Sequence, residues 1–152
     1  METYNGIKLD KSLSKEAKDF IKSASKRKFS CDSIKIDEAR YGSVKMSAQV
    51  LLETTNPYGM IHGGILFMLA DSVAGLTSIS MGKKVVTLSS NISFIKSAKK
   101  GFVHASPKIL HNGKSTILIE VEMIDDFQNL ISKATFNMFV IGEIKDEEVD
   151  NE

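Results

Sequence analysis

The sequence predicts an α+β fold in which one long antiparallel β-sheet wraps around a central buried helix, with a short N-terminal surface helix. Residues 65–81 are apolar on almost every face, which is typical of a helix enclosed by the rest of a protein. Most of the remaining chain alternates apolar and polar residues, as strands with one buried face do. A sheet of this kind has one apolar face that must be buried, and the apolar helix must be buried as well. We therefore expect the helix to pack against the apolar face of the sheet.

Composition indicates a single globular domain. The chain has 152 residues, 42% of them hydrophobic, which is enough to bury a core. Its 20 Lys and Arg nearly balance 19 Asp and Glu, so a net charge of +1 gives no basic field for nucleic acid. Cys31 is the one cysteine, which excludes an intrachain disulfide and favours a reducing, cytoplasmic location. No segment matches a signal peptide or the roughly 20 apolar residues of a membrane span.

The elements before the central helix are predicted from the spacing of apolar residues and from the Pro and Gly residues that interrupt regular structure. Apolar residues at helical spacing predict the surface helix, and strict alternation predicts a half-buried strand. Pro57 and Gly59 mark the loop that leads into the central helix, which is expected to end near Gly82. In order, we expect a loose lead-in over residues 1–10, a helix over 12–26, an extended segment over 30–36, a strand over 42–53 and a loop over 54–62.

Four hairpin-connected strands are expected after the central helix. The first should place Val86, Leu88, Ile92 and Phe94 on one face, and the pair Asn112-Gly113 is a strong hairpin signal. The four strands are expected over residues 85–95, 102–110, 117–124 and 130–141. The whole chain then divides into a lead-in and surface helix over 1–29, the main domain over 30–144 and an acidic, frayed tail over 145–152.

A second copy of the chain is expected to complete the fold. One sheet leaves part of an all-apolar helix uncovered, and a partner subunit would supply the missing wall. We therefore expect a homodimer, with a dimer of dimers as a further possible assembly.

The first turn of the central helix suggests an oxyanion hole. Helix N-termini present unpaired N–H groups and a partial positive charge. Gly63 and Gly64 stand at this point and, having no side chains, let a ligand oxygen approach the backbone. Such a site stabilises a carbonyl that gains negative charge. Glycines also open many helices that bind nothing, and His62 taken alone is read as a cap or loop residue.

Asp71 is the only ionisable residue in the first three turns of this helix. It lies eight residues beyond Gly63, roughly 10–12 Å along the helix axis. Asp71 is therefore too far from a carbonyl held at Gly63 of the same subunit, whereas Asp71 of a partner subunit could reach it. There it would be a general base or a nucleophile. The alternative is a buried acid capped by Ser72 or by loop amides. The chain's histidines and Cys31 lack metal-ligand spacing, so we expect no metal, and no serine lies in a nucleophile elbow.

These residues match the motif of a known family. The run Asn56-x-x-Gly59-x-x-His62-Gly63-Gly64-x6-Asp71, followed by Thr87, Ile92-Ser93-Phe94 and Ala98-x-x-Gly101, resembles the hotdog-fold acyl-CoA thioesterases of the PaaI-like type, in the 4-hydroxybenzoyl-CoA thioesterase superfamily. The resemblance covers roughly residues 44–140 and implies a hotdog fold that hydrolyses acyl-CoA to a free acid and coenzyme A, with no metal or redox cofactor.

The resemblance also implies a role for each matching residue. The Gly63 amide would hold the thioester carbonyl, Asn56 and His62 would order the loop and the reacting group, and Gly64 would lie beside the substrate. Asp71 of the partner subunit would be the base or nucleophile, with Thr87 helping to position water.

The rest of the substrate has expected contacts too. Phe67 and Met68, with side chains of the partner, would line the acyl slot. The family commonly has an Arg-Pro or Ser-Pro pair where this chain has Lys96-Ser97. The cations expected to meet the phosphates of coenzyme A are Lys96, Lys99, Lys100 and Lys114.

Two other functions compete with hydrolysis. A non-catalytic module that senses acyl-CoA or acyl-carrier protein would use the same fold, but such modules typically lack the catalytic acid that Asp71 provides. A hotdog dehydratase would need an Asp/His pair arranged differently on the helix and loop. The sequence does not predict whether the acyl group is aromatic, short or long.

Overall fold

The computed structural model describes residues 1–26 and 33–144. Cys31 and the predicted tail over 145–152 lie outside the described residues. The elements are β1 (Glu2–Tyr4), β2 (Ile7–Leu9), α1 (Lys15–Lys26), β3 (Ile34–Arg40), β4 (Ser43–Gln49), a 3-10 turn η1 (Leu52–Thr54), α2 (Gly63–Ser80), β5 (Lys83–Phe94), β6 (Phe102–Asn112), β7 (Thr116–Asp125) and β8 (Leu130–Glu143).

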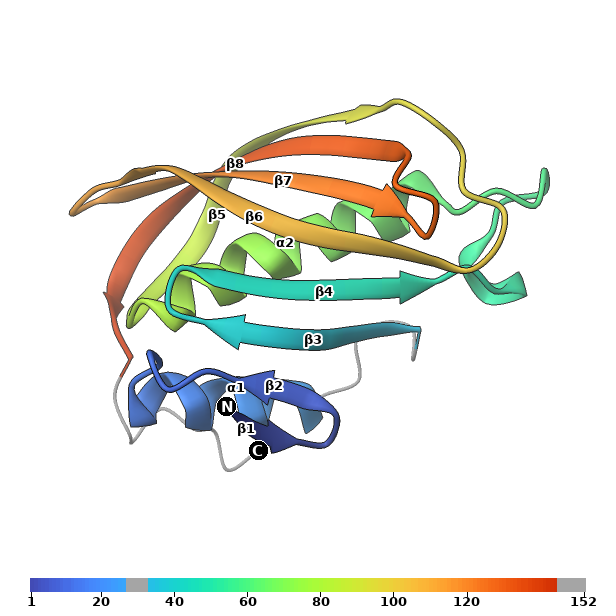
Figure 1. Cartoon of the computed structure of the whole chain (residues 1–152). Coiled ribbons are helices and arrows are strands. Elements are labelled where there is room, and N and C mark those ends of the chain that lie inside the picture. Colours follow the sequence, from blue (N-terminus) through green and yellow to red (C-terminus); the bar gives the residue numbers. More distant parts are fainter. Residues whose placement is uncertain (27–32, 145–152) are drawn as a thin grey trace.

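The strands of the described chain form one curved sheet that wraps around α2 (Figure 1). The strand order is β1-β2-β3-β4-β6-β7-β8-β5. All neighbouring pairs are antiparallel except β2 and β3, which run parallel. The predicted α+β architecture, with a long sheet around a central helix and a short N-terminal helix, is therefore confirmed.

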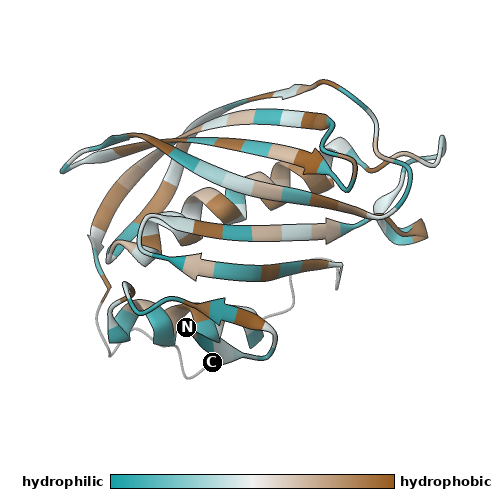
Figure 2. Cartoon of the chain, viewed as in Figure 1, coloured by the Kyte–Doolittle hydropathy of each residue, from teal (hydrophilic) through white to brown (hydrophobic). Residues whose placement is uncertain are grey.

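The core lies between the inner face of the sheet and α2. Brown and teal alternate along the strands in Figure 2 because every second side chain of a strand points towards the helix. Leu69 of α2 has no exposed surface. The predicted alternation of β7 is confirmed, since four of its side chains are fully buried: Ile117, Ile119, Val121 and Met123.

The N-terminal segment differs from the prediction. Residues 1–10 are not a loose lead-in, because β1 and β2 form a hairpin and β2 extends the sheet beside β3. Buried Ile7 and Leu9 anchor this hairpin, but two strands of three residues each are too short to give a periodic signal. The strand predicted over 42–53 ends at Gln49, and Leu52 is 94% exposed on η1.

The C-terminal strands are not four successive hairpins. β6, β7 and β8 do form a meander, and the loop after Asn112 closes its first hairpin. β5, however, pairs with β8 at the edge of the sheet, so the chain crosses over from β5 to β6. Alternation within a strand specifies a buried face but not a neighbour, and the order of pairing was therefore not visible in the sequence.

The prediction that Val86, Leu88, Ile92 and Phe94 share one face of β5 is wrong, because this strand contains a β-bulge. Thr87 lies opposite Met138 and Ser89 lies opposite Asn137, which leaves Leu88 as the extra residue. Because a bulge shifts the alternation by one residue, Val86 does not share a face with Ile92. Thr87 is instead placed on the inner face of the sheet, the face that carries the buried Met138 side chain.

One stripe of α2 remains uncovered in the single chain. Gly64, Phe67, Met68, Asp71 and Gly75 are exposed or half-buried, and they recur at helical spacing. α2 is long and apolar enough to cross a membrane by composition, yet 56% of it is buried here and it lies against the sheet, as a core helix does. The prediction that one sheet leaves part of the helix uncovered is thus confirmed.

Replacing a core leucine should cost far more stability than replacing a surface leucine. Leu69→Ala should lower the free energy of unfolding by about 2–5 kcal/mol, because it opens a cavity between α2 and the sheet. Leu110→Ala, at a residue that is 46% exposed, should change it by about 0.5 kcal/mol or less. Urea denaturation at one protein concentration measures both, and equal losses would contradict the assignment of the core.

Candidate active site

The loop before α2 is ordered by Asn56. Its side-chain oxygen Oδ1 accepts hydrogen bonds from the backbone N–H groups of Tyr58, at 3.0 Å, and Met60, at 3.1 Å. Its own backbone N–H donates to the Met60 carbonyl at 2.7 Å. Asn56 therefore closes the loop on itself, while Gly59 supplies the positive φ of +75° that the turn requires.

Helix α2 begins with two free amides. The His62 carbonyl accepts from the N–H groups of Ile65 and Leu66, at 3.1 Å each, and the exposed His62 side chain makes no capping hydrogen bond. Among the described residues, no acceptor pairs with the N–H groups of Gly63 and Gly64. These amides and the positive end of the helix dipole can bind a developing oxyanion.

The pocket at this helix end has a volume of about 350 Å³. Gly63, Leu66, Asn56 and Lys96 are among its lining residues. The Phe94 ring packs directly on Gly63, since a Cβ atom added there would lie 3.1 Å from the ring. A Cβ atom at position 63 would require this ring to shift by a few tenths of an ångström, and glycine also leaves the amide accessible to a ligand.

Asp71 lies in a second pocket, of about 370 Å³. Its Oδ1 accepts a hydrogen bond of 2.6 Å from the Thr87 hydroxyl, which the bulge in β5 places on the inner face. The partner of the carboxylate is thus Thr87, and neither Ser72 nor a loop amide caps it among the described residues. Asp71 is half-buried, so its second oxygen can meet water or substrate.

The structure separates the two groups that the chemistry needs. Gly63 and Asp71 line different pockets, and eight helical residues correspond to about 12 Å along the axis. Proton transfer requires hydrogen-bond contact or one intervening water. Within one chain, therefore, Asp71 does not reach a carbonyl bound at the Gly63 amide.

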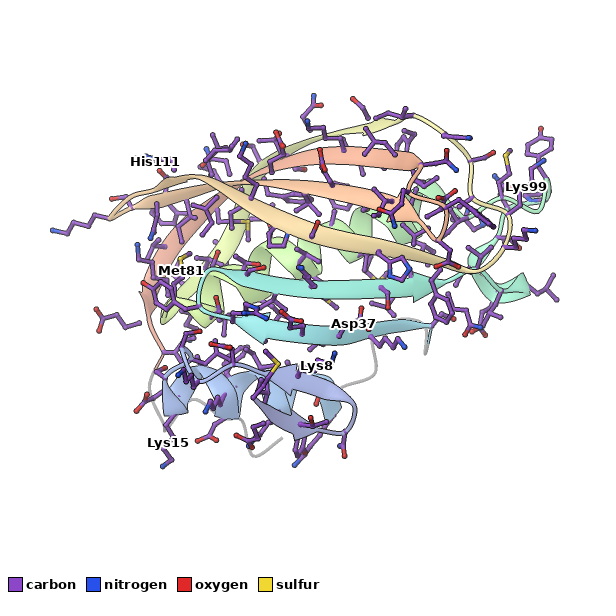
Figure 3. All side chains as sticks on the ribbon, viewed as in Figure 1. Lys8, Lys15, Asp37, Met81, Lys99 and His111 are labelled. Atoms are coloured by element: carbon purple, nitrogen blue, oxygen red, sulfur yellow. The ribbon has the colours of Figure 1, made fainter. Side chains whose placement is uncertain are left out.

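Three of the four candidate lysines belong to the same end of the molecule. Lys96 lines the Gly63 pocket and donates to Asn129 Oδ1 at 3.1 Å. The Lys100 ammonium lies 5.7 Å from the centre of the Phe127 ring. Lys99, between them, is exposed. Lys114 follows the β6 end marked by His111 in Figure 3, at the opposite end of the sheet from Lys99.

The predicted acyl contacts lie on the uncovered stripe of α2. The Phe67 ring is exposed by 37% and packs at 5.6 Å from Phe136 between ring centres. Met68 is half-buried beside it. Neither residue lines the Gly63 pocket or the Asp71 pocket.

A pocket of about 560 Å³ lies on the outer face of the sheet and contains none of the predicted site residues. Lys8 and Asp37, labelled in Figure 3, are on its wall. Nearby, a 2.7 Å hydrogen bond with His104 lowers the pKa of Asp126. The described residues include no cluster of three or more His, Cys, Asp or Glu side chains that would hold a metal.

Sequence reasoning missed the apolar wall of the Asp71 pocket. Phe20 and Ala24 of α1, Val85 of β5 and Met138 of β8 surround the carboxylate. Phe20 and Ala24 are among the apolar residues whose helical spacing predicts the surface helix, but no local signal showed that they meet Asp71. Position 94 was part of the motif, yet the packing of its ring on Gly63 is a tertiary contact.

Comparison with known proteins gives concordant results. The sequence profile of the Thioesterase superfamily matches residues 58–132. A hypothetical thioesterase protein from Streptococcus pneumoniae TIGR4, solved with coenzyme A, is 34% identical, with a TM-score of 0.72 over 75% of this chain and 90% of the other. The chain belongs to the thioesterase superfamily. The 1,4-dihydroxy-2-naphthoyl-CoA hydrolase of Listeria monocytogenes is 29% identical over 64% of this thioesterase and 82% of that protein.

The fold is shared more widely than the sequence. The PaaI protein of Escherichia coli has a TM-score of 0.79 at 24% identity, over 88% of this chain and 99% of the other. The predicted hotdog fold is therefore confirmed. The acyl-coenzyme A thioesterase PaaI of Escherichia coli is 28% identical over 66% of this chain and 71% of that protein, so the predicted PaaI-like family is confirmed and homologues of this chain include acyl-CoA hydrolases. The roles of individual residues stay predictions.

Removing the Asn56 side-chain oxygen should loosen the loop in front of α2. In Asn56→Ala the amides of Tyr58 and Met60 lose their acceptor, and their hydrogen exchange should quicken on the order of tenfold. Asn56→Asp keeps an acceptor oxygen and should exchange as the wild type does. Exchange followed by NMR tests both, and unchanged rates in Asn56→Ala would contradict the role given to Asn56.

Proposed function

We propose that this thioesterase hydrolyses acyl-CoA thioesters to a free acid and coenzyme A, in active sites shared between two subunits. The observation that carries the proposal is the separation on α2 of an unpaired amide at Gly63 and a carboxylate at Asp71. Each is one half of a hydrolytic site, and a two-fold axis brings one subunit's amide to the other's carboxylate.

The Gly63 half polarises the thioester. The carbonyl oxygen accepts from the Gly63 N–H, with the Gly64 N–H beside it, at the positive end of the α2 dipole. These donors are fixed by the loop that Asn56 closes, so little reorganisation is needed when the oxygen becomes an oxyanion. The exposed His62 side chain stands next to this oxygen site and orients the reacting group.

The Asp71 half supplies the attacking oxygen. The carboxylate of the partner subunit takes a proton from a water molecule as that water attacks the thioester carbon. The C–S bond then breaks, and the coenzyme A sulfur takes the proton from Asp71 and leaves as the thiol. The hydrogen bond from Thr87 to Asp71 Oδ1 fixes the carboxylate and leaves Oδ2 for the water. Direct attack by Asp71, through an anhydride, would use the same geometry.

A homodimer follows from the exposed edge of the sheet. β5 pairs with β8 on one side, its other edge has no partner strand among the described residues, and the strand carries exposed apolar side chains at Val86, Leu88 and Phe94. A long apolar edge of this kind is a template for pairing with another strand. The strand that we propose to pair here is β5 of a second copy of the chain. In that arrangement the second copy also covers the exposed stripe of α2 and places its own Asp71 near the Gly63 pocket of the first.

The cations near the Gly63 pocket suit coenzyme A. Lys96, Lys99 and Lys100 occupy the loop between β5 and β6, so the phosphates would lie along this loop with the thioester at Gly63. Lys114 is at the other end of the sheet and would meet the same coenzyme A only across a subunit interface. The thioesterase from S. pneumoniae that was solved with coenzyme A supports this class of substrate.

Asp71 also favours hydrolysis over the rival function of an acyl-CoA sensor. A sensor has no use for a carboxylate that is half-buried and fixed by Thr87 in a pocket with mostly apolar walls. A site that performs general-base catalysis needs such a group.

Replacing the carboxylate should abolish turnover without unfolding the protein. Asp71→Asn keeps the shape of the side chain and removes the base, so kcat should fall on the order of 10²–10⁴-fold. Asp37→Asn, on the outer face of the sheet, is the matched control and should retain wild-type turnover. Release of coenzyme A thiol measures the rate, and near-normal hydrolysis by Asp71→Asn would refute the assignment.

A further inference from the structure

The pocket on the outer face of the sheet takes no part in the proposed hydrolysis. It has a volume of about 560 Å³, within the range of small-molecule sites, and its lining residues come from β2, β3, β4, β6 and β7. It shares no lining residue with the Gly63 pocket or the Asp71 pocket. A ligand bound here would therefore leave both halves of the hydrolytic site free.

Ser47 of β4 is a lining residue of this pocket with an unused hydroxyl. Its side chain has no exposed surface, and its Oγ is the one buried side-chain atom among the described residues that has no hydrogen-bond partner. The strand register places Lys35 and His104 directly beside it. Buried hydroxyls normally have a partner, so an unpaired one calls for an explanation. A ligand in the pocket would supply the missing partner.

Two lysines at one end of the pocket have no ion pair. Lys8 and Lys45 lie on either side of Glu38 in the register of the sheet. Glu38 already accepts a hydrogen bond from Arg40, and the pKa of Glu38 is lowered by Arg40 first and then by Lys45 and Lys8. Among the described residues, neither lysine has a carboxylate within salt-bridge distance. This end of the pocket therefore carries an excess of positive charge.

The other end of the pocket is apolar and held in shape. Phe102 and Ile124 line it, and both side chains are half-buried. Asp126 fixes this wall, because its Oδ1 shares a hydrogen bond of 2.7 Å with His104 and its Oδ2 accepts one of 3.1 Å from the Phe102 N–H. Asp126 also packs over Gly101 so closely that a Cβ atom would not fit there. The apolar wall is thus preformed.

We propose that this pocket binds a small organic anion, with a carboxylate or phosphate head at Lys8 and Lys45. The apolar body of the ligand lies against Phe102, and the Ser47 hydroxyl, midway along β4, donates to the head. Phe102 is opposite Gln49, four residues and about 13 Å from Lys45 along the strand, which leaves room for a head and a body in one line. The site goes beyond the proposed function and does not depend on it.

Charge decides the class of ligand. The two carboxylates that line the pocket, Asp37 and Glu38, each already have a cation partner on β3 itself. The groups left without a partner are two ammoniums and one hydroxyl, all of which can donate hydrogen bonds. Carboxylates and phosphates are acceptors that pair with such donors in charge-assisted hydrogen bonds. A cationic ligand would meet no free carboxylate among the described lining residues.

Lys35 controls access to the Ser47 hydroxyl. Lys35 is on β3 and Phe102 is on β6, so their side chains meet over β4 beside Ser47. The Lys35 ammonium makes only long contacts, 3.9 Å from Asp37 Oδ1 and 5.2 Å from the centre of the Phe102 ring. Contacts of this kind at an exposed site stabilise little. When Lys35 turns towards the anion, it uncovers Ser47 Oγ and adds a third cation to the site.

Three ligands of one shape separate charge from hydrophobic binding. 3-Phenylpropionate, 3-phenylpropanol and 3-phenylpropylamine carry a negative, a neutral and a positive head on the same body. Their dissociation constants are read from the NMR shifts of the Lys45, Ser47 and His104 amides of the full chain. The acid should bind about tenfold or more tightly than the alcohol, and the amine more weakly still. Phenyl phosphate, titrated in the same way, shows which head, carboxylate or phosphate, the site prefers.

Four variants locate the site. Lys8→Met and Lys45→Met should each weaken binding of 3-phenylpropionate about tenfold, because each removes a charged donor. Lys108→Met is the matched control, since this exposed lysine lies on the same face of β6 outside the pocket, and it should leave the dissociation constant unchanged. Ser47→Ala should weaken binding several-fold with an unchanged or higher Tm, because its hydroxyl has no partner to lose.

Equal affinity for the acid, the alcohol and the amine would show that only the apolar wall binds, and tighter binding of the amine would reverse the assigned charge. Either result overturns the inference, as does the absence of shifts at the pocket with every ligand. A lower Tm in Ser47→Ala with unchanged affinity would show that the hydroxyl serves the fold and not a ligand. None of these measurements depends on turnover, so the inference and the proposed function fail separately.

Discussion

The structure depends on the fact that helix α2 is more apolar than one sheet can cover. The curved sheet buries one side of the helix, including Leu69 and Val73, and leaves a stripe from Gly64 to Gly75 open. This stripe carries the features that the proposed chemistry uses: the amides at its start and Asp71 in its middle. The proposed function therefore uses the part of the helix that the fold of one chain does not enclose.

Two local features of the backbone position the groups on this stripe. The bulge at Leu88 turns Thr87 to the inner face of the sheet, where its hydroxyl holds Asp71. The turn closed by Asn56 sets the direction of the chain into α2 and leaves the first two amides unpaired. Bulges and helix N-termini are common means of directing groups at active sites, because each breaks a regular hydrogen-bond pattern at one defined position.

The sequence was sufficient for the architecture and for the motif, and insufficient for tertiary pairing. Alternation in β7 and the apolar character of residues 65–81 predicted the sheet and helix, since burial sets both patterns. The β1–β2 hairpin was missed because strands of three residues are too short to show an alternating pattern. The position of β5 at the edge of the sheet, beside β8, was missed because the alternation within a strand does not specify which strand pairs with it. For the site, spacing placed Gly63 and Asp71 correctly on one helix, but the Thr87 bond and the α1 wall arise from contacts between distant segments.

Complementation between inactive subunits tests the shared active site most directly. Asp71→Asn removes the base, and Gly63→Pro removes the N–H at a helix position where proline is well tolerated; Gly63→Ala adds a Cβ against Phe94 but keeps the N–H. Co-expressed Asp71→Asn and Gly63→Pro subunits should form heterodimers with one intact site, giving about a quarter of wild-type activity in a statistical mixture. Heterodimers confirmed by native mass spectrometry that nevertheless show no activity, while Gly63→Ala remains active, would contradict the account.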